Sequence, residues 1–319
     1  MSAALSTLGG MDVIAWLLDS DPSIRWQVLR DLADAPAEEV AAERARVARE
    51  GWGAELLARQ AADGLWDGGV YRPGWVQEDR PFFDAWTATH FSLEQLREFG
   101  LDPASPQARQ VVGRVREHVR WDDTPYFDGE TEPCVNGTAL ATAVYFGQGG
   151  DTIVSALLAG QLADGGWNCL AEEGARVSSF HSTICAIEGL LAWEQAGGVS
   201  ADATQARTRA EEYLLQRGMF RRVSTGEPAD PRFTMLSYPT RWFYDVLRGL
   251  EHLRRADRRD PRAADAVQLL RSKADAEGRF LLENGHEGPI WSRIGQSEGE
   301  PSRWVTLRAL RVLRWWDGA

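Results

Sequence analysis

Hydrophobic positions recur along this chain at the three-to-four-residue spacing of helices, and the alternating pattern of strands is scarce. One set of segments is apolar on one face, which is typical of surface helices. This set covers residues 37–60, 107–119, 152–162, 203–215 and 262–270. A second set is apolar on all sides, which is typical of buried helices. This set covers residues 24–32, 83–96, 134–145, 180–193, 242–253 and 304–315. The pattern therefore predicts an all-α fold in which surface helices alternate with buried ones.

The buried segments begin at intervals of about 50–60 residues, which indicates a repeat of one helix pair per unit. Six such pairs could stack as an open solenoid or close into a ring. Because an open solenoid leaves a hydrated concave face, one buried helix in every pair favours closure. We expect a single domain over residues 1–319, with its core at about residues 10–316.

The linkers between helices also repeat. Gln60 and Trp66 bound one copy of a Q-x-x-x-G-x-W pattern, Gln161 and Trp167 bound a second, and a degenerate copy lies at 274–280. We expect the glycine to end the helix with a positive φ, the aromatic ring to pack into the junction, and the glutamine to bond carbonyls at the helix end. These features predict structure rather than chemistry.

The two complete copies resemble the QW motifs of squalene and hopene cyclases and related terpenoid cyclases. The helix-pair repeat is similar to the toroid that those enzymes share with protein prenyltransferase β subunits. The resemblance implies a single (α/α)6 toroid with six inner helices, six outer helices and a central cavity lined by residues that open the inner helices. The chain lacks the D-x-D-D acid motif of class II cyclases.

Two cysteines and a histidine form the first chemical constellation. Cys134 and His181 open consecutive buried segments, and Cys169 lies in the linker between them. Thiolate and imidazole are good zinc ligands, and a carboxylate can complete a tetrahedral site. Farnesyltransferase-type β subunits have a similar arrangement, which implies Glu132, Cys134 and His181 as zinc ligands, with Cys169 as a fourth ligand or a replacement for Glu132. The residues alone leave open a metal-free cluster or plain packing, because free cysteine is often buried.

Three arginines form a second constellation. Arg25, Arg241 and Arg303 each open a buried segment, where a cation opposes the helix dipole. Ring closure would bring them into one sector of the cavity, suited to a diphosphate, sulfate or carboxylate. The alternative is that each arginine pairs with a nearby acid. These acids are Asp21, Asp245 and Glu300.

Aromatic side chains and acids supply the remaining candidates. Rings near the helix openings could pack an apolar ligand or stabilise a carbocation, or could serve only to pack the fold. The further candidates for substrate contact are Trp26, Trp86, Phe180, Trp242, Trp304 and His286. The acid–base candidates are Asp84, His90, Asp128 and Asp245. A single histidine on a buried helix is often a satisfied core residue, which is the alternative for His90.

Composition limits the classes of partner that the chain could bind. The chain has 35 Lys+Arg against 47 Asp+Glu, a net charge of −12, which argues against nucleic-acid binding. It has no apolar run long enough to span a membrane, and we expect no signal peptide because the first residues lack a basic region. Three cysteines predict a reducing, cytoplasmic location. We expect a small-molecule substrate with an anionic group, zinc as the possible cofactor and no nucleotide cofactor.

The favoured hypothesis is a terpenoid-cyclase-like or prenyltransferase-like enzyme that acts on a small apolar molecule with an anionic group. The resemblance implies cyclisation or alkyl transfer, with zinc assisting the reaction. A prenyltransferase-like enzyme would need a partner subunit. Two alternatives remain: a carbohydrate-active (α/α)6 lyase or glycosidase, and a non-catalytic small-molecule binding or scaffold protein.

Overall fold

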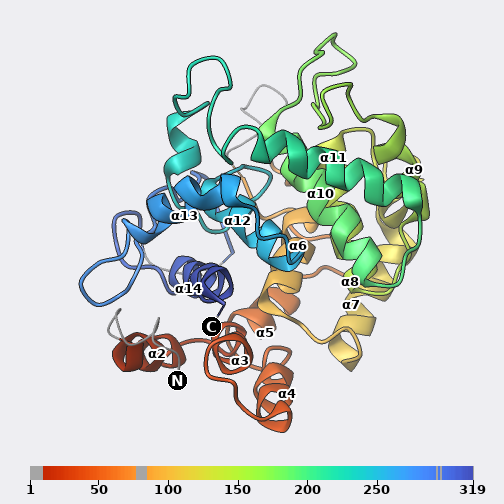
Figure 1. Cartoon of the computed structure of the whole chain (residues 1–319). Coiled ribbons are helices and arrows are strands. Elements are labelled where there is room, and N and C mark those ends of the chain that lie inside the picture. Colours follow the sequence, from red (N-terminus) through yellow and green to blue (C-terminus); the bar gives the residue numbers. More distant parts are fainter. Residues whose placement is uncertain (1–9, 77–84, 292–293, 295–296, 319) are drawn as a thin grey trace.

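The computed structural model describes residues 10–76, 85–291, 294 and 297–318. These residues are mostly helical, and the strands among them form one short hairpin, β1 (Arg120–Trp121) with β2 (Thr124–Pro125). The all-α prediction is confirmed (Figure 1). No helix within the described ranges has the length and apolar character needed to cross a membrane.

Six helices correspond to the segments predicted to be buried, and we refer to them as the inner helices. They are α3 (Pro22–Asp31), α6 (Thr89–Phe99), α8 (Pro133–Tyr145), α10 (Phe180–Gln195), α12 (Val246–Arg255) and α14 (Arg303–Asp317). Each inner helix contacts the next in chain order, and α14 contacts α3, so the series of contacts returns to its start. In Figure 1 the dark blue α14 accordingly lies beside the red α3.

The remaining α-helices pack outside the inner helices. They are α2 (Gly10–Leu18), α4 (Ala37–Arg46), α5 (Gly51–Leu57), α7 (Pro106–His118), α9 (Asp151–Ala159), α11 (Ala201–Leu215) and α13 (Ala264–Arg271). Three 3₁₀ turns connect elements: η1 (Tyr126–Asp128), η2 (Pro231–Thr234) and η3 (Pro261–Ala263). Serine side chains cap several helix N-termini, as local propensity favours. The capping serines include Ser105, Ser179, Ser200 and Ser302.

Three predicted segments have different boundaries in the structure. The described part of the segment predicted at 83–96 is helical only from Thr89, as α6. The stretch 37–60 is divided into α4 and α5 because Gly51 has a φ of +60°, and a Cβ there would lie 1.9 Å from Asp21 Oδ2. That Asp21 oxygen accepts a hydrogen bond from the backbone N–H of Trp52, in the first turn of α5. The inner helix α12 begins at Val246 rather than at 242, because the Asp245 side chain caps it by accepting from Arg248 N.

The two complete linker motifs have the same geometry. Gly64 and Gly165 have φ of +85° and +101°, which confirms the predicted positive φ. The Gln60 amide donates to the carbonyls of Gly64 and Val111, and the Gln161 amide repeats this with Gly165 and Ala206. The glutamine thus connects the linker to the next outer helix rather than only to the helix that it follows.

The tryptophans of these motifs fix the junction between outer and inner helices. The indole N–H groups of Trp66 and Trp167 donate to Leu56 and Leu157, in the last turns of α5 and α9. The backbone N–H of Trp66 donates to Thr89 Oγ1 at the start of α6, and that of Trp167 donates to Thr183 Oγ1 near the start of α10. These repeated contacts hold the starts of the inner helices at a common level, where the candidate site lies.

Candidate functional site

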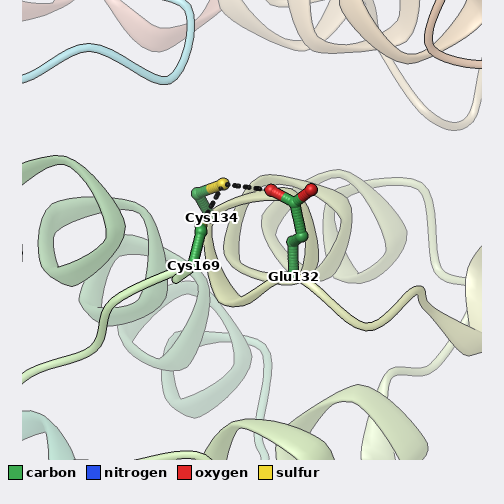
Figure 2. Close-up of side chains that lie close together, drawn as sticks. All are labelled: Glu132, Cys134 and Cys169. Atoms are coloured by element: carbon green, nitrogen blue, oxygen red, sulfur yellow. Dashed lines mark hydrogen bonds between the residues drawn. The ribbon is translucent and has the colours of Figure 1, made fainter. Parts of the chain in front are cut away.

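Glu132, Cys134 and Cys169 form a compact group at the N-terminal end of α8. Their ligand atoms all lie within 4.8 Å of one another. Glu132 directly precedes α8, Pro133 provides a favourable first helical residue, and Cys134 lies in the first turn. The Cys134 thiol lies 3.5 Å from Glu132 Oε2, and a hydrogen bond of 2.7 Å joins the two thiols (Figure 2). Helix α8 and the linker before α10 therefore bring together two sulfurs and a carboxylate.

Ser182, in the first turn of α10, holds Cys169 in this position. Its hydroxyl donates to Cys169 Sγ at 3.2 Å and accepts from the Cys169 backbone N–H at 3.1 Å. The hydrogen bond between the thiols lowers the pKa of Cys169 and raises that of Cys134, so Cys169 ionises first. Sequence analysis missed Ser182, although its place directly after His181 at a helix opening was a usable signal.

His181, the fourth predicted ligand, is not part of the group among the described residues. Its Nδ1 accepts a hydrogen bond of 2.8 Å from the backbone N–H of Tyr244. Its ring packs edge-on against Phe233, Trp242 and Phe243. Burial lowers the pKa of His181 to about 4, so the imidazole is neutral near pH 7. The structure thus brings together three of the four residues that the sequence predicts.

The three grouped residues fit a zinc ion by their chemistry. Zinc binds thiolates at about 2.3 Å, so tetrahedral geometry requires two sulfurs to lie about 3.8 Å apart. The sulfurs of Cys134 and Cys169 lie 2.7 Å apart, and both cysteines are free, so they must separate by about 1 Å to share the ion. Three protein ligands with a fourth position for water or substrate are typical of catalytic rather than structural zinc sites.

Arg241 is a buried cation without a hydrogen bond or ion pair to its guanidinium in the part of the chain that the structure describes. Its exposed fraction is 5%. The guanidinium lies over the rings of Trp86 and Phe91, 5.4 and 5.9 Å from their centroids. Burial lowers its pKa to about 10. Because a buried charge is costly unless it is paired, Arg241 is suited to receive an anionic group.

The space next to Arg241 is nearly filled. A void of about 20 Å³ lies between Arg241 and an aromatic wall that includes Trp86, Phe91 and Trp291. The Trp86 indole donates to the carbonyl of Glu287, and the Trp291 indole donates to the carbonyl of Thr87, which holds the 287–291 segment over the void. The predicted substrate cavity at the inner-helix openings is therefore closed in this conformation.

The aromatic wall beside Arg241 continues to Tyr71. The ring of Phe91 lies 5.0 Å from that of Trp86 and 4.8 Å from that of Tyr71. Desolvation raises the pKa of Tyr71, and the charge of Cys134 adds to the rise. The rings of Trp86, Phe91 and Tyr71 thus form one cluster that begins beside Arg241.

The other two predicted arginines do not join Arg241. Arg25 donates to Glu43 Oε1 at 2.6 Å and to the Ser20 carbonyl. Arg303 donates to the Trp16 carbonyl at 3.1 Å and lies 4.8 Å from the Trp16 ring centroid. The expectation of three converging guanidinium groups is corrected: Arg25 has a local acid partner, which is Glu43 rather than Asp21, and Arg303 packs against α2.

The predicted aromatic residues divide between several surroundings. Trp86 lies in the wall beside Arg241. Trp242 and His286 both stack on the ring of Phe243, with 3.8 and 4.1 Å between ring centroids. Phe180 packs in the core against Phe233 and Tyr244. The last two, Trp26 and Trp304, line a different cavity.

The acid–base candidates are dispersed among different roles. Asp84 lies outside the described residues, and Asp128 is exposed at the end of η1. His90 is a satisfied core residue: its ring nitrogens bond Tyr126 Oη and Thr138 Oγ1, and burial lowers its pKa to about 3. The Asp245 carboxylate is used as a helix cap and accepts from the Ser237 backbone as well. None of the three described side chains belongs to the Glu132–Cys134–Cys169 group.

Comparison with known proteins gives only distant likenesses. No protein-family model and no curated protein matches the chain. Among solved structures, a crystal structure of a protein from Actinoplanes is similar with a TM-score of 0.47 and 15% identity over 99% of both chains. The type II terpene cyclase MstE from Scytonema is similar with a TM-score of 0.49 and 17% identity over 97% of both chains. At these values the likenesses assign no activity to this chain.

Proposed function

We propose that this chain is an enzyme built on a single (α/α)6 toroid and that Glu132, Cys134 and Cys169 bind zinc at its reaction centre. The closed series of contacts among the inner helices supports the toroid. The observation that carries the function is the group itself: two thiols and a carboxylate from separate segments lie within 4.8 Å. When bound, zinc supplies a Lewis acid or activates a thiolate or oxygen nucleophile.

The surrounding residues would bind different parts of a substrate or position the metal ligands. Arg241 would receive the anionic group, because its guanidinium is buried and has no hydrogen-bond or ion-pair partner among the described residues. Trp86 and Phe91 would pack the apolar body, with their faces available to a developing positive charge. Ser182 holds Cys169 by two hydrogen bonds and so fixes one ligand of the metal. An apolar molecule with one anionic end matches this arrangement, and cyclisation or alkyl transfer are the reactions proposed for it.

Substrate entry requires the 287–291 segment to move, since the void next to Arg241 holds only about 20 Å³. Two indole–carbonyl hydrogen bonds hold the described part of this segment, through Trp86 and Trp291. Each such bond contributes about 1 kcal/mol net, so opening is affordable from the binding energy of an apolar substrate. Closure over a bound substrate would exclude water from the reaction centre.

The first test is the metal content of the purified chain, measured by inductively coupled plasma mass spectrometry after growth with zinc. We expect about one zinc per chain in the wild type and a loss of zinc in Cys134→Ser. Cys185→Ser is the matched control, because Cys185 is also buried but lies outside the group. Wild-type protein without metal, or equal loss in the control, would contradict the zinc site.

The second test is turnover. Zinc-loaded protein is incubated with farnesyl diphosphate, an apolar molecule with an anionic end, and products are identified by mass spectrometry. The proposal expects product formation that depends on zinc and falls at least tenfold in Arg241→Met, because one charge-assisted contact is lost. Binding of the probe without any product would favour the non-catalytic alternative.

A further inference from the structure

A second cavity reaches the C-terminal ends of α6, α8 and α10, and the first half of α14 also lines it. Its volume is about 670 Å³, and all six inner helices contribute to its lining. On α8 it is lined by Tyr145, which is about 16 Å along the helix axis from Cys134. The cavity therefore does not include the Glu132–Cys134–Cys169 group.

Aromatic side chains separate this cavity from the void beside Arg241. The ring of Tyr238 stacks on Trp304 with 4.5 Å between centroids, and Trp304 stacks on Phe99 at 6.0 Å. The Gln95 amide donates to Tyr238 Oη and fixes this ring in place. Phe99 lines the void and Trp304 lines the cavity, so this stack of rings lies between the two spaces.

The lining is strongly basic although the chain as a whole is acidic. Eight arginine and four glutamate side chains line the cavity, whereas the whole chain has a net charge of −12. Some of these arginines are fully paired: Arg248 contacts Glu188 at 2.6 Å, and Arg254 contacts Glu251 at 2.6 Å. These ion pairs neutralise some of the eight arginines, but the cavity lining still has an excess of positive charge.

The excess resides in guanidinium groups that either lack a close acid or keep one buried N–H without a partner. The Arg255 guanidinium has no hydrogen bond or ion pair within the described ranges, and the acid nearest to Arg308 is Glu251, at 3.7 Å. Arg311 is 8% exposed and bonds Asp31 and Gln27, but its Nε is buried without a partner, as is Nε of Arg97. Buried donors without acceptors are costly, so these groups are suited to an anionic ligand.

Helix dipoles account for only some of these arginines. A cation in the last turn of a helix is favoured by the dipole, and this explains Arg97 and Arg255, which end α6 and α12. The effect falls off within one turn. Arg308 and Arg311 lie more than one turn before the end of α14 at Asp317, and both are only 8% exposed. The dipole therefore does not explain Arg308 and Arg311, and Asp31 and Gln27 satisfy the Arg311 guanidinium only in part.

We propose that this cavity is a binding site for a small molecule that carries two or more linked phosphate groups. Guanidinium groups match phosphate oxygens with two parallel hydrogen bonds, and several of them converge here from α12 and α14. A diphosphate supplies both the multiple charge and the many acceptors that Arg255, Arg308 and the Nε atoms of Arg97 and Arg311 lack. The site is independent of zinc and of the reaction proposed above.

The test is isothermal titration calorimetry of the full chain with inorganic pyrophosphate at low ionic strength. We expect saturable binding that weakens as salt is added. Arg255→Gln and Arg308→Gln should each weaken binding about tenfold, since each removes a charge-assisted contact. Both variants should fold, because Arg255 makes no ion pair within the described chain and Glu251, the acid 3.7 Å from Arg308, keeps Arg254 as its partner at 2.6 Å. Arg116→Gln is the control, because Arg116 is exposed on the outer helix α7 and does not line the cavity.

Three outcomes decide the proposal. Tighter binding of pyrophosphate than of orthophosphate, lost in the two cavity variants and kept in Arg116→Gln, would support it. The absence of binding to the wild type at millimolar pyrophosphate would overturn it. Binding that persists in the Arg255→Gln, Arg308→Gln double variant would also overturn it, because the anion would then lie elsewhere. Circular dichroism of each variant checks that the helical fold is intact.

Discussion

Arg241 and Arg248 are both buried arginines in the centre of the fold, and the structure predicts opposite effects for their replacement. The exposed fractions are 5% for Arg241 and 2% for Arg248. Arg248 contacts Glu188 and donates to the carbonyls of Arg241 and Phe243. Arg241 has no such partner within the described residues. Replacing each by methionine removes the charge while keeping a long apolar side chain.

The expected magnitude for Arg241→Met follows from its pKa. Burial lowers the pKa of Arg241 from 12.5 to about 10, which corresponds to a cost of about 3 kcal/mol for the charged form in the folded state. The contacts with the rings of Trp86 and Phe91 return about 1 kcal/mol. We therefore expect Arg241→Met to raise the free energy of unfolding by about 2 kcal/mol. The variant no longer buries an unpaired charge, which the wild type keeps for binding a ligand.

Arg248→Met is the matched control and should have the opposite sign. It leaves Glu188 in the interior without its cation, so we expect a loss of about 3–5 kcal/mol. Urea unfolding at pH 7, followed by circular dichroism, measures both variants without adding ions that could bind to arginine. A decrease of 1 kcal/mol or more in Arg241→Met would refute the reasoning, because the guanidinium would then be stabilised by the fold itself.

Three further predictions concern pH, the linker motifs and metal removal. Burial raises the pKa of Glu94 from 4.5 to about 7, so the folded state keeps a proton that the unfolded state releases. The free energy of unfolding therefore falls as pH rises from about 4.5 to 7. Glu94→Gln should remove this fall and be more stable than the wild type by about 3 kcal/mol in urea unfolding at pH 8. Thr183→Val removes the acceptor of the buried Trp167 backbone N–H and should lower the free energy of unfolding by about 1–3 kcal/mol. Thr152 is exposed, so Thr152→Val should change this free energy little. Equal effects of the two variants in urea unfolding would contradict the role of Thr183. Stripping zinc with EDTA should lower the melting temperature of the wild type and leave that of Cys134→Ser unchanged; an equal shift in both would place the metal elsewhere.

The repeat of the helices could be predicted from the sequence, because burial of one helix face is a local property of residue spacing. The linker motifs could also be predicted, since Gly64 and Gly165 adopt a positive φ and glycine is the residue that most readily adopts it. The threonines that accept from the tryptophan backbone were missed, because Thr89 and Thr183 lie about 16–23 residues from their partners and carry no local signature.

The candidate site was predictable only in part. Cys134 and Cys169 come together because the linker before α10 returns to the start of α8, which the repeat suggested. His181 opens the same helix α10, yet its ring turns toward Tyr244. The rotation of a helix about its axis decides such orientations, and it depends on packing between distant segments.

The charged cavity was missed for a similar reason. Arg308 and Arg311 are three residues apart on α14, which places them on one face of this helix. That spacing predicts a polar face, but it does not tell whether this face meets solvent, an acid or a cavity. The arrangement of all six inner helices is needed to show that the arginines of α12 and α14 line one space.

The central claim is that Glu132, Cys134 and Cys169 hold a zinc ion, and X-ray absorption at the zinc K edge of the purified chain tests it most directly. The account predicts two sulfur atoms at about 2.3 Å and oxygen ligands at about 2.0–2.2 Å from one bound zinc per chain. Cys134→Ser should lose the metal or one sulfur from this shell. A zinc shell of nitrogen and oxygen only, or a chain that binds no zinc, would contradict the account.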